Sequence, residues 1–232
     1  MKKILNALLL LACVSAWCPG QDSFARGEGL FMQNKPGEAA VYLENSIAED
    51  PGQVKAYLYL GIAYEQMGKT DEAIAVYRQV LSRAGDMAAA VACNLGNAYF
   101  RKGFATEAEA MYTQALGADR VFAPAYLGRA NARIKRGSLR DAVADYEQYL
   151  ALEPRSPQRA SIERLTAFIR AEFAESERRR LVAEEAQRVE AERRQALLDE
   201  VAASLQSAAG ASQGLSTGAE NIEGYDGEFE LE

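Results

Sequence analysis

The sequence contains no histidine among its 232 residues. Histidine is the usual general base at neutral pH and a common metal ligand, so its absence excludes Ser-His and Cys-His catalytic pairs and most zinc sites. The three cysteines, Cys13, Cys18 and Cys93, are too few for a disulfide framework. We therefore expect no enzyme activity, no cofactor and no metal site, and we interpret Cys93 as a small core or groove residue rather than a reactive thiol.

The chain also lacks an excess of positive charge. Its 26 lysines and arginines stand against 33 aspartates and glutamates, which gives a net charge of -7. Nucleic acids and anionic lipid surfaces attract positively charged proteins through their phosphates. This balance therefore argues against a nucleic-acid partner and against a membrane surface as a general partner.

Apolar runs long enough to cross a bilayer are absent as well. The run "ILNALLLLA" follows Lys2 and Lys3, and its length of about nine residues is that of a signal-peptide hydrophobic region. Residues 1–20 therefore predict export to the bacterial cell envelope, with two processing sites open. "LLAC", ending at Cys13, resembles a lipobox and would give a membrane-anchored lipoprotein, whereas "VSA", ending at Ala16, suits ordinary signal peptidase and would give a periplasmic protein.

What the chain does have is a long-period repeat. Gly27, Gly61, Gly96 and Ala130 follow one another at steps of 34, 35 and 34 residues. Other columns recur in phase with them, namely Gly68, Gly103 and Gly137, then Ala39, Ala73, Ala108 and Ala142, then Leu43, Tyr77, Tyr112 and Tyr146. Helix periodicity alone does not produce such spacing, so each copy is a unit that must bury its apolar face against the next one.

This pattern resembles the tetratricopeptide family, whose unit is a helix–turn–helix of about 34 residues. The resemblance covers about residues 22–154, and it implies an all-α, right-handed α-solenoid of about four helix hairpins. We place the repeat domain at residues 21–155, with copies at about 21–52, 53–86, 88–121 and 122–155. The fourth copy departs from the family pattern, because Arg129 replaces the usual leucine and Arg133 the usual tyrosine.

The smallest residues stand in the middle of the most apolar helices, as at Gly61. We expect them to let paired helices approach closely, with aromatic residues such as Tyr77 filling the gap between hairpins. Gly68, Gly103 and Gly137 fit helix ends that favour a left-handed backbone, and Pro36-Gly37 is expected to make the equivalent turn in the first copy.

The resemblance also implies a concave surface, lined by the first helix of each hairpin, where family members generally bind extended peptides or partner helices. The positions that the core columns leave free are Leu58, Tyr59, Ile62, Asn94, Asn97, Phe100, Arg101, Asn131, Ile134 and Lys135. Asn97 and Asn131 share one column, and their amides can both donate to and accept from a peptide backbone. A ladder of them would hold an extended chain, although solvated surface residues are the alternative interpretation.

Family members that clamp a terminal carboxylate need lysines on this face. Leu58, Cys93 and Leu127 occupy the column where the first such lysine is expected. We therefore expect a mixed groove with apolar contacts and charge from Arg101 and Lys135, rather than a carboxylate clamp.

Residues 156–206 predict a helix that caps the last repeat and continues as a charged rod. Ile162, Leu165, Phe168 and Ile169 have the helical spacing for the cap. Glutamates and arginines four residues apart follow, as in a solvated helix, and a coiled coil is the alternative because valines recur at seven. Residues 207–232 change to a Gly/Ser-rich composition with an acidic end, and we expect a disordered linker and tail there, or a tethered linear peptide.

Together these features predict a non-catalytic adaptor or assembly scaffold of the bacterial cell envelope, which holds a peptide or helical segment of another protein. The alternative is a structural spacer or homo-oligomer that acts through the charged C-terminal helix. A membrane contact is expected only through lipid on Cys13.

Overall fold

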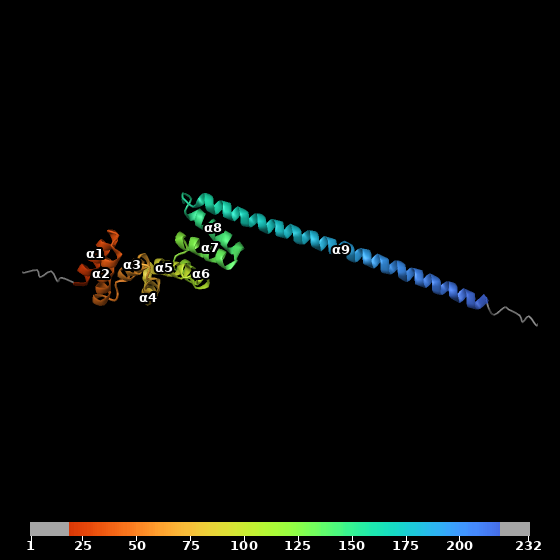
Figure 1. The fold of residues 1–232 in the computed structure, drawn as a ribbon, viewed down its shortest axis with the longest axis horizontal. Coiled ribbons are helices and arrows are strands. Elements are labelled where there is room, and N and C mark those ends of the chain that lie inside the picture. The colour runs from red at the N-terminus through yellow and green to blue at the C-terminus, as the bar shows by residue number, and fades with distance from the viewer. Residues whose placement is uncertain (1–18, 219–232) are drawn as a thin grey trace, which may run out of the picture. The chain divides into compact units, whose positions relative to one another are not determined.

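The computed structural model describes the chain from residue 19 to residue 218, and its side chains from residue 23 to residue 210. The predicted signal region with Cys13 and Cys18 lies outside the described residues, as does the acidic end of the tail. Figure 1 shows the course of the helices. None of the described helices is long and apolar enough to cross a membrane.

The fold is all-α, as expected. Its α-helices are α1 (Pro19–Met32), α2 (Pro36–Glu49), α3 (Val54–Gln66), α4 (Thr70–Leu81), α5 (Ala88–Arg101), α6 (Ala105–Ala118), α7 (Ala123–Arg136), α8 (Leu139–Leu152) and α9 (Arg159–Gly218), with a 3-10 turn, η1, at Gly85–Met87. The described residues include no strand. Helices α1 to α8 form the four predicted hairpins in chain order.

Left-handed glycines close the first helix of three hairpins. Gly68, Gly103 and Gly137 have φ angles of 75°, 87° and 80°, a region that favours residues without a Cβ. In the first hairpin the prediction was wrong, because the left-handed residue is Asn34, at φ 58°, and Pro36 already opens α2. Asparagine tolerates this conformation, and proline suits the first turn of a helix because its missing N–H is not needed there.

Close helix approach explains the glycines inside the helices. A Cβ added to Gly61 would lie 2.2 Å from Cε1 of Tyr77, which is fully buried. Tyr112 lies between two such glycines, because a Cβ on Gly96 or on Gly128 would meet its ring at 2.8 Å or 2.4 Å. As predicted, tyrosines pack against glycines, and this packing builds the core between successive helices.

The first helices line the inner side of the curved stack. Helix α1 approaches α3, α3 approaches α5, and α5 approaches α7, whereas the second helices of the described hairpins approach one another less closely. In a curved stack the elements on the inside lie closer together than those on the outside. The groove predicted for the first helices therefore lies on the concave face.

The start of α9 closes the stack, although not with all the residues expected. Ile162 packs into the cluster around Tyr146, and Ile169 is also buried. Leu165 and Phe168 point away, with Phe168 64% exposed, and Thr166 is buried instead. Positions 162, 166 and 169 follow one helical stripe, and Thr166 satisfies its hydroxyl by donating to the carbonyl of Glu163 at 3.1 Å.

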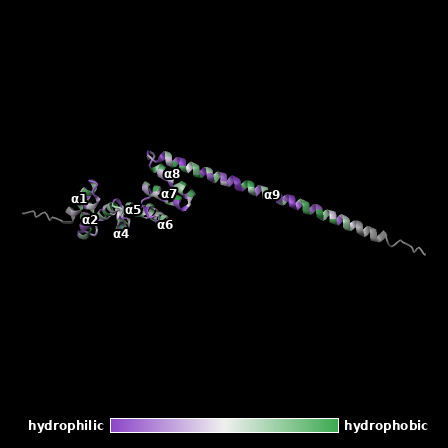
Figure 2. Cartoon of the chain, viewed as in Figure 1, coloured by the Kyte–Doolittle hydropathy of each residue, from purple (hydrophilic) through white to green (hydrophobic). Residues whose placement is uncertain are grey.

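The chain divides at Ile169 into two units, and the rest of α9 belongs to the second. Its middle is hydrophilic (Figure 2), with ion pairs three or four residues apart such as Arg178–Glu175 and Arg188–Glu185. The helix also runs through residues 207–218, where the sequence predicts a linker. Alanine and serine are frequent in that stretch, and alanine favours a helix despite the three glycines at 210, 214 and 218.

Candidate functional site

The concave face carries three columns, each with one residue from every hairpin. Because the steps are again 34, 35 and 34 residues, the columns are Phe24, Leu58, Cys93 and Leu127; Glu28, Ile62, Asn97 and Asn131; and Phe31, Glu65, Phe100 and Ile134. We call this surface the groove. The groove contains most of the predicted site residues. It also contains four residues that were not predicted, namely Phe24, Glu28 and Phe31 on α1 and Glu65 on α3.

The apolar predicted residues form the walls of the groove. Leu58 and Ile62 on α3 are half-buried against the cluster that contains Tyr77. Phe100 packs in the same way on the cluster around Tyr112, and Ile134 on the cluster around Tyr146. Each side chain therefore has one side fixed by the core and another that a bound chain can cover.

Both asparagines of the second column already use their amide oxygen in a hydrogen bond. Oδ1 of Asn97 accepts a hydrogen bond from the hydroxyl of Tyr112 at 2.8 Å, and Oδ1 of Asn131 accepts one from Tyr146 at 2.7 Å. The amide oxygens are thus taken by the second helix of the same hairpin, which leaves the two NH₂ groups as donors. Asn94 is not part of this ladder, because its Nδ2 donates to the carbonyl of Ala90 in its own helix at 2.9 Å.

The predicted cation Arg101 forms an ion pair within the protein, although its own side chain is 47% exposed. Its guanidinium lies 2.6 Å from Oε2 of Glu65, whose side chain is only 10% exposed. Burial raises the pKa of Glu65 above its ordinary value, and the arginine opposes this effect. The second oxygen of Glu65 and the hydroxyl of Tyr77 are buried without a bonding partner, although the carboxylate is near enough to add to the effect of burial in raising the pKa of Tyr77.

Lys135 is held in a similar way one repeat further on. Its ammonium lies 5.4 Å from the centre of the Phe100 ring, within the range of a cation–π contact. Both predicted cations thus have a partner inside the protein, although both side chains remain exposed. It is the missing lysines at Leu58, Cys93 and Leu127 that argue against a carboxylate clamp.

Tyr59 meets aromatic residues of the first hairpin. Its ring lies 6.1 Å from that of Phe24 and 5.1 Å from that of Phe31, so the three rings form one aromatic patch. Burial and the neighbouring carboxylate of Glu28 raise the pKa of the Tyr59 hydroxyl. Continuing the columns back by 34 residues from Leu58, Ile62 and Glu65 would have found these α1 positions.

Cys93 lies in the floor of the groove and does not have the properties of a nucleophile. It is 4% exposed, and burial raises the pKa of its thiol to about 12. The thiol therefore stays protonated at neutral pH. No group of acids and cysteines suited to a metal ion occurs among the described residues.

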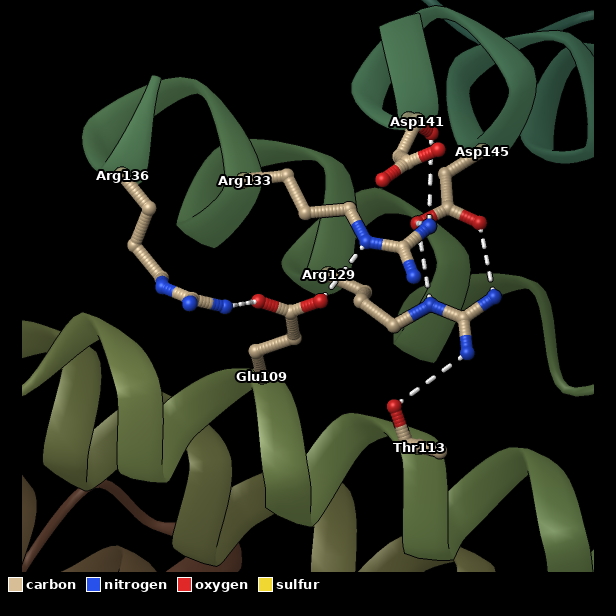
Figure 3. Close-up of polar contacts among 7 residues, drawn as sticks. All are labelled: Glu109, Thr113, Arg129, Arg133, Arg136, Asp141 and Asp145. Atoms are coloured by element: carbon tan, nitrogen blue, oxygen red, sulfur yellow. Dashed lines mark hydrogen bonds and ion pairs between the residues drawn. The ribbon is translucent and has the colours of Figure 1, made fainter. Parts of the chain in front are cut away.

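The two arginines that depart from the family pattern form an ion cluster on α7 (Figure 3). Arg129 binds Asp145 through two hydrogen bonds of 2.9 and 2.7 Å and also reaches Thr113. Arg133 links Asp145, at 2.7 Å, to Glu109, at 2.9 Å. Asp145 is 3% exposed, so its charge depends on these partners. The cluster joins α6, α7 and α8, and it fixes the position of the Asn131 helix.

Comparison with known proteins agrees with this architecture. Two profiles described as "Tetratricopeptide repeat" match residues 30–92 and 93–160, which together are more than half of the chain. The chain belongs to the tetratricopeptide repeat family. Repeats of this kind stack into solenoids whose concave surfaces serve protein–protein interaction.

Individual relatives cover parts of the chain. RNA polymerase II-associated protein 3 from Mus musculus is 36% identical over 112 residues, which are 48% of this chain and 17% of that protein, so the chain spans a small part of this relative. The first TPR of Spaghetti (RPAP3), solved with the HSP90 peptide SRMEEVD, is 29% identical, with a TM-score of 0.48, over 53% of this chain and 94% of that one. PilF from Pseudomonas aeruginosa is 18% identical and has a TM-score of 0.58 over 67% of this chain and 69% of that one.

Proposed function

We propose that this protein is a non-catalytic adaptor that holds an extended segment of another protein in the groove. The observation that carries this proposal is the pair of amides at Asn97 and Asn131. Each amide is fixed by a tyrosine through its oxygen, and each keeps its NH₂ group for a ligand. Fixed donors in one column suit the carbonyl groups of an extended backbone, because they need no particular side chain on the ligand.

The surroundings of the amides favour a mixed ligand. Leu58, Ile62, Phe100 and Ile134 offer apolar contact beside the donors. Arg101 and Lys135 are engaged with Glu65 and Phe100. A segment within a chain suits this groove better than a free terminal carboxylate, because Leu58, Cys93 and Leu127 occupy the column where the first clamping lysine is expected.

Capture from native cells tests this function. The tagged full chain would be crosslinked in its own cells, and the proteins retained by the parent would be compared with those retained by Asn97→Asp/Asn131→Asp. Aspartate keeps an oxygen for each tyrosine and removes the NH₂ donor, so the pattern of captured proteins should lose its specific bands. Gln79→Glu/Gln114→Glu is the matched control, because it adds two negative charges on exposed positions of α4 and α6 outside the groove and should retain the bands. Equal capture by the parent and the aspartate variant would remove the amides from the site.

The proposed place of action is the bacterial cell envelope, and this proposal is supported by the short apolar run after Lys2 and Lys3, which has the length of a signal-peptide hydrophobic region. Fractionation of cells that express the parent or Cys13→Ser tests it. A lipoprotein should leave the membrane fraction when Cys13 is replaced, and a periplasmic protein should be soluble in both cases. Retention in the cytoplasm in both cases would contradict an envelope role.

One observation favours a second role for α9 as a self-associating scaffold. Leu197, Leu198, Val201 and Leu205 lie within one face of the helix and are 48% to 66% exposed. No charged residue follows Glu200 in the described part of α9, so this face lacks the ion pairs that solvate the middle of the helix. Sedimentation of the full chain and of Leu198→Glu/Val201→Glu would show a fall in mass if the face joins two copies.

A further inference from the structure

Two junctions between repeats have a cation in the same position, although one forms an ion pair and the other a cation–π contact. In each, a cation from one hairpin reaches back to the third column of the hairpin before it. Arg101, which directly follows Phe100, reaches Glu65, and Lys135, which directly follows Ile134, reaches the ring of Phe100. At both junctions, the third-column residue is therefore in contact with a cationic side chain of the following hairpin.

The first junction lacks this internal cation. Its third-column residue is Phe31, and the residue that corresponds to Arg101 and Lys135 is Gln66, which is neutral and exposed. The ring of Phe31 is only half-buried, and that of Tyr59 lies 5.1 Å from it. The ring of Phe31 therefore has no cation from the next hairpin, whereas the ring of Phe100 in the same column is in contact with Lys135.

An acid stands beside these rings. Glu28 lies between Phe24 and Phe31 on the same face of α1, because the three residues are spaced by four and three positions. It also lies next to the hydroxyl of Tyr59. No lysine or arginine among the described side chains forms an ion pair with Glu28, whereas Glu65, the other acid of the columns, is paired with Arg101.

We infer that this end of the groove, formed by Phe24, Glu28, Phe31 and Tyr59, binds an arginine side chain of the partner segment. A guanidinium can stack on an aromatic ring through its plane and donate to a carboxylate through its edge, so it uses both features together. The segment would thus place an arginine near α1 and its backbone near Asn97 and Asn131. This inference rests on the proposed function and specifies the class of partner.

A peptide array tests the inference with a defined probe. Short peptides of random sequence with both ends blocked would be printed in three matched sets that carry arginine, citrulline or glutamate at one central position. Citrulline has the shape of arginine without its charge. The full chain should bind the arginine set at least about fivefold better than the citrulline set, since a partly desolvated cation–π contact with an acid nearby contributes on the order of 1 kcal/mol.

Three variants make the test specific. Glu28→Gln removes the acid, and Gln66→Arg supplies the missing internal cation, so both should bring the ratio between the arginine and citrulline sets close to one. Glu107→Gln removes an exposed acid of α6 outside the groove and should leave the ratio unchanged. A ratio near one in the parent, or an undiminished ratio in both Glu28→Gln and Gln66→Arg, would overturn the inference.

The outcomes also separate the inference from the proposed function. The parent could bind all three peptide sets equally, with weaker binding in Asn97→Asp/Asn131→Asp. This result would support the groove and reject the arginine site. Absence of binding to every set would reject both.

Discussion

The hydroxyl of Tyr112 donates to Oδ1 of Asn97 at 2.8 Å, and Tyr146 repeats this contact with Asn131 at 2.7 Å in the next hairpin. Tyr112 is 1% exposed, so its hydroxyl has no water to replace the asparagine. The same amide therefore serves the fold through its oxygen and is available to a ligand through its nitrogen.

Because of this double role, Asn97→Ala should destabilise the fold. A buried tyrosine hydroxyl left without an acceptor costs about 1–3 kcal/mol, whereas Asn97→Asp keeps the acceptor and should cost less. Urea unfolding followed by circular dichroism would measure both free energies. Equal stability of the parent and Asn97→Ala would show that the Tyr112 contact contributes nothing to folding.

Substitution of Gly61 tests the close approach of α3 and α4. Gly61→Ala would place a Cβ 2.2 Å from the ring of Tyr77, and such overpacking costs about 1–3 kcal/mol. Gly117→Ala is the matched control, since Gly117 lies in α6 with open space around it. The control should gain about 0.5–1 kcal/mol because alanine favours the helix. A thermal transition that moves in the same direction for both variants would contradict the packing described.

The ion cluster on α7 should be a strong determinant of stability. Asp145→Ala leaves Arg129 and Arg133 without their shared acid, and loss of one partner from a buried ion pair costs about 3–5 kcal/mol. Glu185→Ala on α9 is the control, because its pair with Arg188 is exposed and contributes at most about 1 kcal/mol. Urea unfolding would measure the free energy of unfolding of both variants. If Asp145→Ala lost no more stability than Glu185→Ala, the cluster would contribute no more than a surface ion pair.

Two glutamates should respond to acid in opposite directions. Burial acts to raise the pKa of Glu109, but the hydrogen bonds from Arg133 and Arg136 outweigh it and hold the pKa below the ordinary 4.5. Glu109 therefore contributes stability that is present above pH 4.5 and is lost as the pH falls through its lowered pKa. Burial instead raises the pKa of Glu65, so the fold gains stability from this residue as the pH falls toward 4.5.

Unfolding free energies of Glu109→Gln and Glu65→Gln, measured between about pH 7 and about pH 3, would check both signs. Relative to the parent, Glu109→Gln should lose less stability in acid, and Glu65→Gln should lose more. If the unfolding free energies of the two variants changed equally with pH, this result would contradict the opposite environments of these carboxyl groups.

The hairpins could be predicted from the sequence because every feature is repeated. A single glycine such as Gly68 is a weak signal, but its recurrence at Gly103 and Gly137 identifies helix ends in phase. The first hairpin shows the limit of this reasoning, since Asn34 takes the left-handed position and no other copy has an asparagine there.

The interior of the groove was less accessible to sequence reasoning. Its residues were placed by column, yet the partners of Arg101 and Asn97 come from other helices, and a single sequence does not reveal such pairs. Arg129 was a departure from the pattern, and only its contact with Asp145 explains how a charge fits between repeats. The extent of α9 was also missed, because alanine-rich segments with glycine have only weak preferences for helix or coil.

Site-directed photocrosslinking in living cells tests the central claim most directly. A photoreactive residue at Ile62, in the groove, should crosslink to a protein partner, and this product should disappear in the Asn97→Asp/Asn131→Asp background. The same residue at Gln79, exposed on α4 outside the groove, should give no such product. A partner captured equally from Gln79 and Ile62, or captured from Ile62 regardless of the asparagines, would contradict the claim that the groove holds the ligand.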